Sequence, residues 1–99
     1  MRTYAVVWSD TAEQQLDSIR AYLTAEVSAR RAEEVAAGLV AATRTLAIAP
    51  RAFPIRDTGR GAVRERRILP KWSYIISYEV DETRSIVAVA TVEHTSRNA

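Results

Sequence analysis

The residues best suited to bind an anion are four basic side chains in one short stretch: Arg64, Arg66, Arg67 and Lys71. Residues 51–72 carry 7 basic and 2 acidic groups, a net charge of +5, although the whole chain has a net charge of only +2. A guanidinium group can bind phosphate or carboxylate through two parallel hydrogen bonds. The stretch therefore predicts a surface for phosphate or for acidic side chains. The alternative is an edge strand whose charges keep it soluble.

Alternation along a strand divides these charges between two faces. Arg64 and Arg66 fall on one face, and Glu65 and Arg67 fall on the other, because successive side chains point to opposite sides. The four basic groups therefore cannot all point the same way. One interpretation of Arg67 is an ion pair with Glu65 on the covered side of the sheet.

Three further side chains are candidates for contact with a binding partner. His94 is the only histidine, and Arg97 follows it in a polar tail. We predict both as contacts to a binding target, although a histidine at a strand end is also a common surface group. Trp72 stands next to Lys71 in a predicted turn. It is either a hydrophobic anchor for a partner or a side chain that folds back onto the core.

Several chemistries have no residues to support them. The chain has no cysteine and 1 histidine, so we predict no metal site and no thiol chemistry. The Gly-Arg-Gly stretch at 59–61 lacks the length and the lysine of a phosphate-binding loop. No Gly-x-Ser-x-Gly sequence is present. We therefore assign no catalytic residue and no cofactor.

The candidate residues must be positioned by one domain, since 99 residues at 47% hydrophobic content suffice for a single core, which we place over residues 1–99. A strand is predicted at 4–8. The spacing Asp10 to Glu13 has the form of a capping box and predicts a helix to Glu26. Ser28 is placed to cap a second helix, whose apolar stripe runs until Pro50.

The second half of the chain reads as a loop followed by strands. Residues 50–61 are rich in Pro and Gly and predict a loop. Strands are predicted at 62–69, 73–80 and 85–93, and their short separators imply antiparallel pairing. The last strand is apolar on both faces, which indicates a central position or a face hidden by another chain. The expected fold is α+β: an N-terminal strand, a two-helix hairpin, then three antiparallel strands in a sheet that the helices cover.

The sequence also bears on cellular location. The apolar N-terminal run is too short for a signal core or a membrane span, so we expect no membrane contact. Because the chain has no cysteine, a reducing cytoplasmic environment fits it.

The order of these elements resembles that of the ParE/RelE toxin superfamily, the toxin halves of bacterial toxin–antitoxin pairs. Segments from both halves of the chain carry the resemblance: Val7-Trp8-Ser9, Ala12, Leu16, Ile19 and Tyr22, Pro50, Arg66-Arg67-Ile68, Tyr74 to Tyr78, and His94. The resemblance implies a type II toxin, neutralised in a hetero-oligomer by a cognate antitoxin. RelE-like members cut messenger RNA in the ribosome, whereas ParE-like members act on DNA gyrase without chemistry of their own.

Two positions favour the ParE-like branch. Where similar ribonuclease members carry an Arg and a Tyr, this chain has Ser73 and Thr95. A positioned acid or base contributes about a hundredfold to ten-thousandfold in rate, so such losses would remove most of a ribonuclease activity. The resemblance then implies contacts to gyrase or to its DNA complex at Arg64, Arg66, Arg67, Lys71, His94 and Arg97, and antitoxin contacts at Trp72 and Arg67. A RelE-type ribonuclease is the alternative, and a non-toxic binding module is a third reading.

Overall fold

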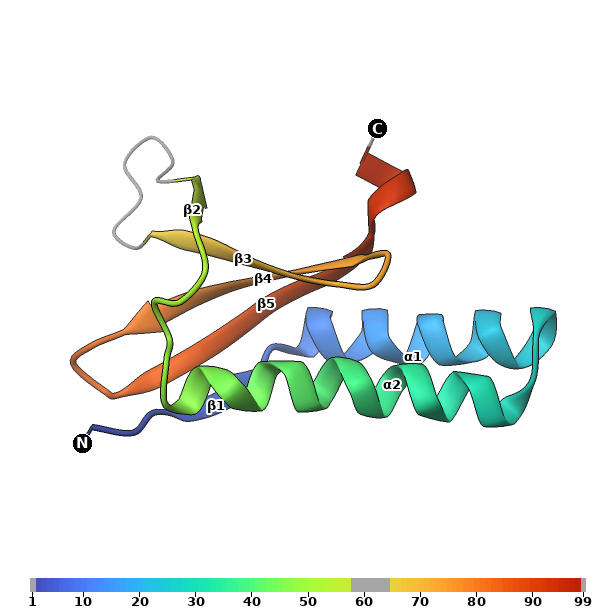
Figure 1. The fold of residues 1–99 in the computed structure, drawn as a ribbon, viewed down its shortest axis with the longest axis horizontal. Coiled ribbons are helices and arrows are strands. Elements are labelled where there is room, and N and C mark those ends of the chain that lie inside the picture. The colour runs from blue at the N-terminus through green and yellow to red at the C-terminus, as the bar shows by residue number, and fades with distance from the viewer. Residues whose placement is uncertain (1, 58–64, 99) are drawn as a thin grey trace.

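The computed structural model describes residues 2–57 and 65–98 (Figure 1). Its elements are β1 (Ala5–Trp8), α1 (Asp10–Glu26), α2 (Ala29–Arg44), the 3-10 helix η1 (Thr45–Ala47), β2 (Ile55–Asp57), β3 (Arg66–Lys71), β4 (Tyr74–Asp81), β5 (Ile86–His94) and the 3-10 helix η2 (Thr95–Asn98). The α+β class, the helical hairpin and the three C-terminal strands are confirmed. Of the strand predicted at 62–69, residues 62–64 lie outside the described residues.

The strands form one sheet in the order β1-β5-β4-β3-β2. β1 runs parallel to β5, and the other neighbours are antiparallel. β5 lies between β1 and β4, so a central position, one of the two interpretations of its apolar faces, is the one observed. The short strand β2 was not predicted, because it lies within the Pro-rich stretch expected to be a loop. Ile55 pairs with Arg67 there, and the Pro54 carbonyl accepts the Ile68 N–H at 3.1 Å.

A β-bulge explains the apolar residues on both faces of β5. Ser77 of β4 pairs with Thr91, but Tyr78 pairs with Val89, so Ala90 is an extra residue in the ladder. The bulge shifts the alternation by one position. Val87 and Val89 are buried before it, and Val92 is buried after it.

Serine side chains cap both helices. The Ser9 hydroxyl accepts the Ala12 N–H at 3.0 Å, so the prediction that Asp10 is the capping residue is wrong. Asp10 lies instead inside the first turn, where its charge favours the positive end of the helix dipole. The cap predicted at Ser28 is confirmed, because its hydroxyl accepts the Arg31 N–H at 3.1 Å. Both caps hold N–H groups that a helix terminus leaves unpaired.

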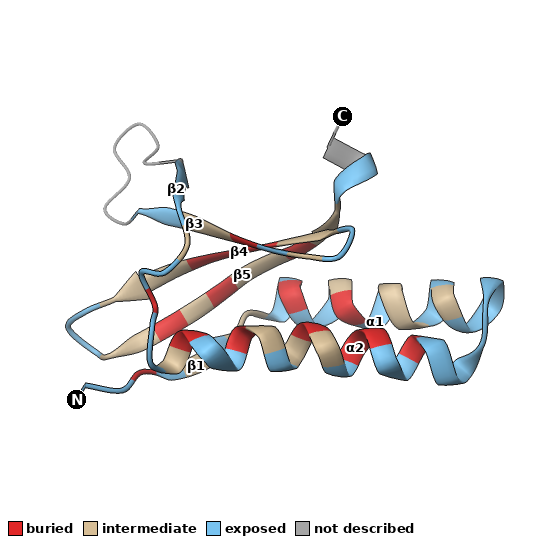
Figure 2. Cartoon of the chain, in the orientation of Figure 1, coloured by how far each residue is buried: buried red, intermediate tan, exposed pale blue. Residues whose placement is uncertain are grey.

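The helices cover one face of the sheet, and the core lies between these layers (Figure 2). The largest side chains with almost no exposure come from α2, η1 and the sheet: Leu39, Leu46, Ile76, Tyr78, Val87, Val89 and Val92. The Tyr78 hydroxyl donates to the Pro50 carbonyl at 2.7 Å, which satisfies its polar atom, and burial raises the pKa of this phenol. The distal half of the helical hairpin extends past the sheet (Figure 1).

Charged residues close the other end of the sheet, where the chain begins. Glu82, in the turn between β4 and β5, forms ion pairs with Arg2 at 2.9 Å and with Arg51, and it accepts a hydrogen bond from the Tyr4 hydroxyl at 3.0 Å. The Arg51 guanidinium, then the Tyr4 hydroxyl, hold the pKa of Glu82 below its usual value. The Glu82 carboxylate therefore connects the β4–β5 turn to the N-terminal segment and to the segment that follows η1.

Replacing Glu82 with Gln should lower the melting temperature at neutral pH by a few degrees at most, because the cluster is exposed and screened by solvent. A depressed pKa stabilises the fold above the unfolded-state value near 4.5, and this stabilisation is lost as the pH falls through the folded-state pKa. The gap between wild type and variant should therefore shrink below about pH 4.5 in thermal melts. Glu26→Gln, an exposed carboxylate at the end of α1, is the matched control for losing one charge. A gap that persists unchanged at low pH would contradict the assignment.

Candidate functional site

The arginines of β3 make contacts within the chain. Arg66 pairs across the ladder with Glu79, and its Nη2 lies 3.0 Å from a carboxylate oxygen of that residue. The Arg67 side chain is only 12% exposed; it donates from Nη1 to the Phe53 carbonyl at 2.8 Å and lies 3.4 Å from Glu65. The Arg67–Glu65 pair is therefore confirmed. Arg67 holds the segment before β2 against β3, and both binding roles predicted for it remain predictions.

Two of the predicted contact residues cannot be placed. Arg64 lies outside the described residues, and so does the side chain of Arg97, although its backbone belongs to η2. The remaining candidates divide between the two ends of β3. Arg66 begins that strand, and Lys71 ends it.

Lys71, Tyr74 and His94 lie side by side across three neighbouring strands, and we call these residues the sheet-end row. Lys71 is the ladder partner of Tyr74, and Tyr74 is the ladder partner of His94. The rings of Tyr74 and His94 meet edge to face, with centroids 5.2 Å apart and planes at 88°. The Lys71 ammonium lies 4.5 Å from the centre of the Trp72 ring, a cation–π contact. The row thus brings one cation and two aromatic rings together, and Trp72 lies beside its cation.

The tautomer of His94 follows from its neighbours. The Ser96 N–H donates to Nδ1 at 3.1 Å, and the Ser96 hydroxyl lies 2.7 Å from the same nitrogen. A backbone N–H can only donate, so Nδ1 is the acceptor and Nε2 carries the proton of the neutral ring. One of the two nitrogens is therefore already engaged by the chain itself.

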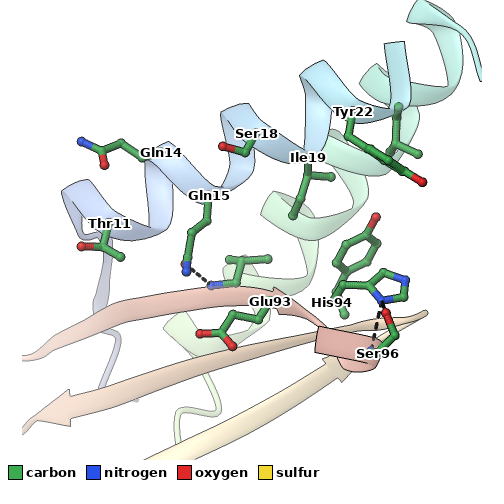
Figure 3. A pocket seen from close by; sticks show the side chains of 12 residues that line it. Thr11, Gln14, Gln15, Ser18, Ile19, Tyr22, Glu93, His94 and Ser96 are labelled. Carbon is green, nitrogen blue, oxygen red and sulfur yellow. Dashed lines mark hydrogen bonds between the residues drawn. The ribbon is translucent and has the colours of Figure 1, made fainter. Parts of the chain in front are cut away.

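A groove of about 620 Å³ runs between α1 and the end of β5, next to the sheet-end row (Figure 3). Residues of α1 and β5 line it, together with Tyr74 of β4 and Ser96 of η2: Thr11, Gln14, Gln15, Ser18, Ile19, Tyr22, Leu23, Tyr74, Val92, Glu93, His94 and Ser96. Gln15 reaches across, and its side-chain oxygen accepts the Val92 N–H at 2.8 Å. That bond satisfies a backbone group beyond the last ladder partner of β1, which is Val89.

Sequence reasoning did not assign the α1 side of this groove. Its residues recur at steps of four, three and four: Thr11, Gln15, Ser18 and Tyr22. The apolar stripe of α1 has the same steps, one residue later. A second, mixed stripe beside an apolar one was the available signal, because residues with such spacing share a helix face.

The groove offers hydrogen-bonding and aromatic groups but little positive charge. Among the described residues, no arginine or lysine lines it, and Glu93 contributes a carboxylate. No cluster of three metal-binding side chains occurs in residues 2–57 and 65–98. Such a surface suits a peptide better than a phosphate, whose negative charge needs cations.

The family of the chain is decided by its sequence. Residues 6–99 match the family model described as the ParE toxin of the type II toxin–antitoxin system parDE. The chain belongs to the ParE toxin family. A search of curated proteins finds no match. No helix within the described part of this ParE-family chain has the length and apolar content needed to cross a membrane.

Solved structures with a similar fold come from toxin–antitoxin systems. A chain of the chromosomal ParDE system from P. aeruginosa aligns with a TM-score of 0.72 and 12% identity, covering 93% of this chain and 96% of that one. A chain of the RelBE2 complex from Mycobacterium tuberculosis aligns with a TM-score of 0.69 and 18% identity, covering 95% of this chain and 93% of that one. A chain of the archaeal RelE-RelB complex from Pyrococcus horikoshii aligns with a TM-score of 0.56 and 15% identity, covering 96% of this chain and 98% of that one. At these identities the similarity concerns the fold, which ParE-family and RelE chains share.

Proposed function

We propose that this ParE-family chain is a cytoplasmic toxin that binds DNA gyrase, or gyrase bound to DNA, and blocks religation without making or breaking a bond itself. The observation that carries the proposal is the family match over residues 6–99. Growth arrest would follow from persistent DNA breaks. On a plasmid, such a toxin would favour cells that keep the plasmid.

The surroundings of His94 support binding rather than ribonuclease chemistry. Cleavage of RNA through its 2′-hydroxyl needs a base, an acid and cations around the phosphate. His94 already uses Nδ1 for Ser96, and among the described residues the adjoining groove has no arginine or lysine. Arg66 and Arg67, the two arginines of β3, are already paired with Glu79 and Glu65.

The gyrase contact is proposed at the sheet-end row and at the C-terminal tail after it. Lys71 forms no ion pair within residues 2–57 and 65–98, so its charge is available to a carboxylate or a phosphate of the target. Trp72 is 55% exposed beside it. An exposed tryptophan is typical of the residues that dominate protein interfaces, and here the Lys71 ammonium lies over its ring.

The proposed partner that neutralises the toxin is an antitoxin, in a hetero-oligomer. The solved structures of similar fold include a RelBE2 and a RelE-RelB complex. The groove between α1 and β5 has room for an amphipathic segment, because Ile19 and Val92 give it apolar contacts while Gln15 and Ser18 give it polar ones. The exposed Tyr22 continues this surface onto the overhanging half of the hairpin. A purified chain that binds no hydrophobic dye would weaken this part of the proposal.

The deciding experiment adds the purified chain to gyrase, ATP and supercoiled plasmid, and in parallel to translating ribosomes. Linear or nicked plasmid that appears on denaturation and depends on gyrase is the expected result. Relaxed or supercoiled plasmid alone would overturn the gyrase assignment.

The ribosome arm tests the second candidate, a RelE-type ribonuclease. The observation that favours this candidate is the packing of His94 against Tyr74 next to Lys71, which gathers an imidazole, a phenol and a cation. Message cut at codon positions, and no longer cut after His94→Ala, would establish that candidate instead. Silence in both assays would leave a binding module without toxicity.

A further inference from the structure

Two residues near the sheet-end row break local rules of structure. Trp72, in the two-residue turn between β3 and β4, has φ of 54°, in the left-handed region that bulky side chains rarely adopt. Gly38 lies inside α2, where glycine destabilises a helix relative to alanine. A residue that violates its local preference is retained only where the surrounding structure compensates for it.

The two exceptions explain each other. A Cβ atom built on Gly38 would lie 2.8 Å from Cζ3 of Trp72, and closer still to Cη2. Real Cβ atoms do not approach other atoms so closely. The indole ring therefore occupies the place that any other side chain at position 38 would need. Trp72 nevertheless stays 55% exposed, and the Lys71 ammonium lies 4.5 Å from the centre of its ring.

The contact lies where it can control the sheet-end row. The tip of the β3–β4 hairpin consists of Trp72 and Ser73, which connect Lys71 directly to Tyr74. The Ser73 carbonyl accepts the Thr95 N–H at 2.9 Å, and Thr95 follows His94. A displacement of this tip must therefore move all three members of the row together.

We infer that Trp72 is a positioning residue. Its ring packs directly on Gly38 of α2, and we call this contact the lock. The lock fixes the position of Lys71, Tyr74 and His94 relative to the helices. The functional part of this inference rests on the proposed gyrase contact at the row. Gly38 lies under the ring and gives no side chain to a partner. A change at Gly38 therefore acts on the target only through Trp72.

Gly38→Ala tests the lock directly by fluorescence. In a Trp8→Phe background, Trp72 is the only tryptophan, since the chain has 2. The added methyl group should displace the ring, which shifts the emission to longer wavelength and increases quenching by acrylamide. Ala37→Ser, at the exposed neighbouring position of α2, is the matched control and should change neither. An unchanged emission in Gly38→Ala would overturn the lock.

Thermal melts provide a second test, because Gly38→Ala should change the melting temperature in opposite directions with and without Trp72. With Trp72 present, Gly38→Ala should lower the melting temperature, because the methyl group expels the ring. In a Trp72→Ala background the same substitution has free space and improves helix propensity, so it should raise the melting temperature. Equal effects in the two backgrounds would mean that the residues are not coupled.

His94 reports whether the lock positions the row. It is the only histidine, so its ring protons give one identifiable set of NMR signals. Gly38→Ala should shift these signals through the neighbouring Tyr74 ring, whereas Ala37→Ser should not. An unmoved His94 signal would overturn the positioning role even if the chain stays folded.

The gyrase assay then separates this inference from the proposed function. Gly38→Ala should need at least about tenfold more protein than wild type for the same plasmid cleavage, and Ala37→Ser should match wild type. Equal potency of Gly38→Ala and wild type would overturn the functional role of the lock. If wild type itself leaves the plasmid intact, the gyrase proposal fails, while fluorescence, melting and the His94 signal still decide whether the lock exists.

Discussion

Replacing Leu39 with Ala is expected to lower the free energy of unfolding by about 3–4 kcal/mol, because the truncation leaves a cavity in the main core. Leu39 has no exposed surface and belongs to the cluster that joins α2 to the sheet. Domains of this size have about 5–15 kcal/mol of stability in total, so the change removes a large share of it. The melting temperature should fall by on the order of 20 °C.

Val27→Ala is the matched control for this truncation. Val27 is 63% exposed at the end of α1, so its methyl groups contribute little buried area, and the change should cost well under 1 kcal/mol. Chemical denaturation of both variants measures the difference. If Leu39→Ala costs no more than Val27→Ala, the core does not lie between the helices and the sheet as described.

The elements of the fold could be predicted because their signals are local. The apolar steps of α1, the serine before α2 and the short separators between strands depend only on neighbouring residues. β2 could not be predicted in this way. Its pairing is supplied by β3, about ten residues further along, and a Pro-rich stretch gives no sign of that partner. The bulge at Ala90 could not be predicted either, because it depends on the pairing of β5 with β4. In the sequence of β5 alone, a shift of register leaves only apolar residues that fall on both faces.

The candidate site was predicted as a list of residues but not as an arrangement. Arg66 and Lys71 are close in sequence, yet a strand places them about 16 Å apart. Tyr74 and His94 are far from each other in sequence, yet the register of β4 and β5 makes them neighbours. The edge-to-face contact of the Tyr74 and His94 rings depends on that register.

Replacing Lys71 with Glu is expected to reduce plasmid cleavage in the gyrase reaction at least tenfold, which corresponds to about 1.4 kcal/mol of lost binding. Lys71 is the cation of the sheet-end row, and a carboxylate there would repel the acidic group or phosphate that the lysine is proposed to contact. The fold should tolerate the change. The substitution removes one cation–π contact with Trp72, worth about 0.5–1 kcal/mol at an exposed site.

The control is Arg30→Glu, which changes the net charge by the same amount on the far part of α2, where the side chain is 91% exposed. Its effect on cleavage should stay within about twofold, because long-range attraction alone is screened over about 8–10 Å at physiological salt. Equal losses for both variants would mean that gyrase senses only the overall charge of the toxin. A loss confined to Lys71→Glu, and less sensitive to added salt, would place the contact at the end of the sheet, where β3, β4 and β5 bring a cation and two aromatic rings into one row.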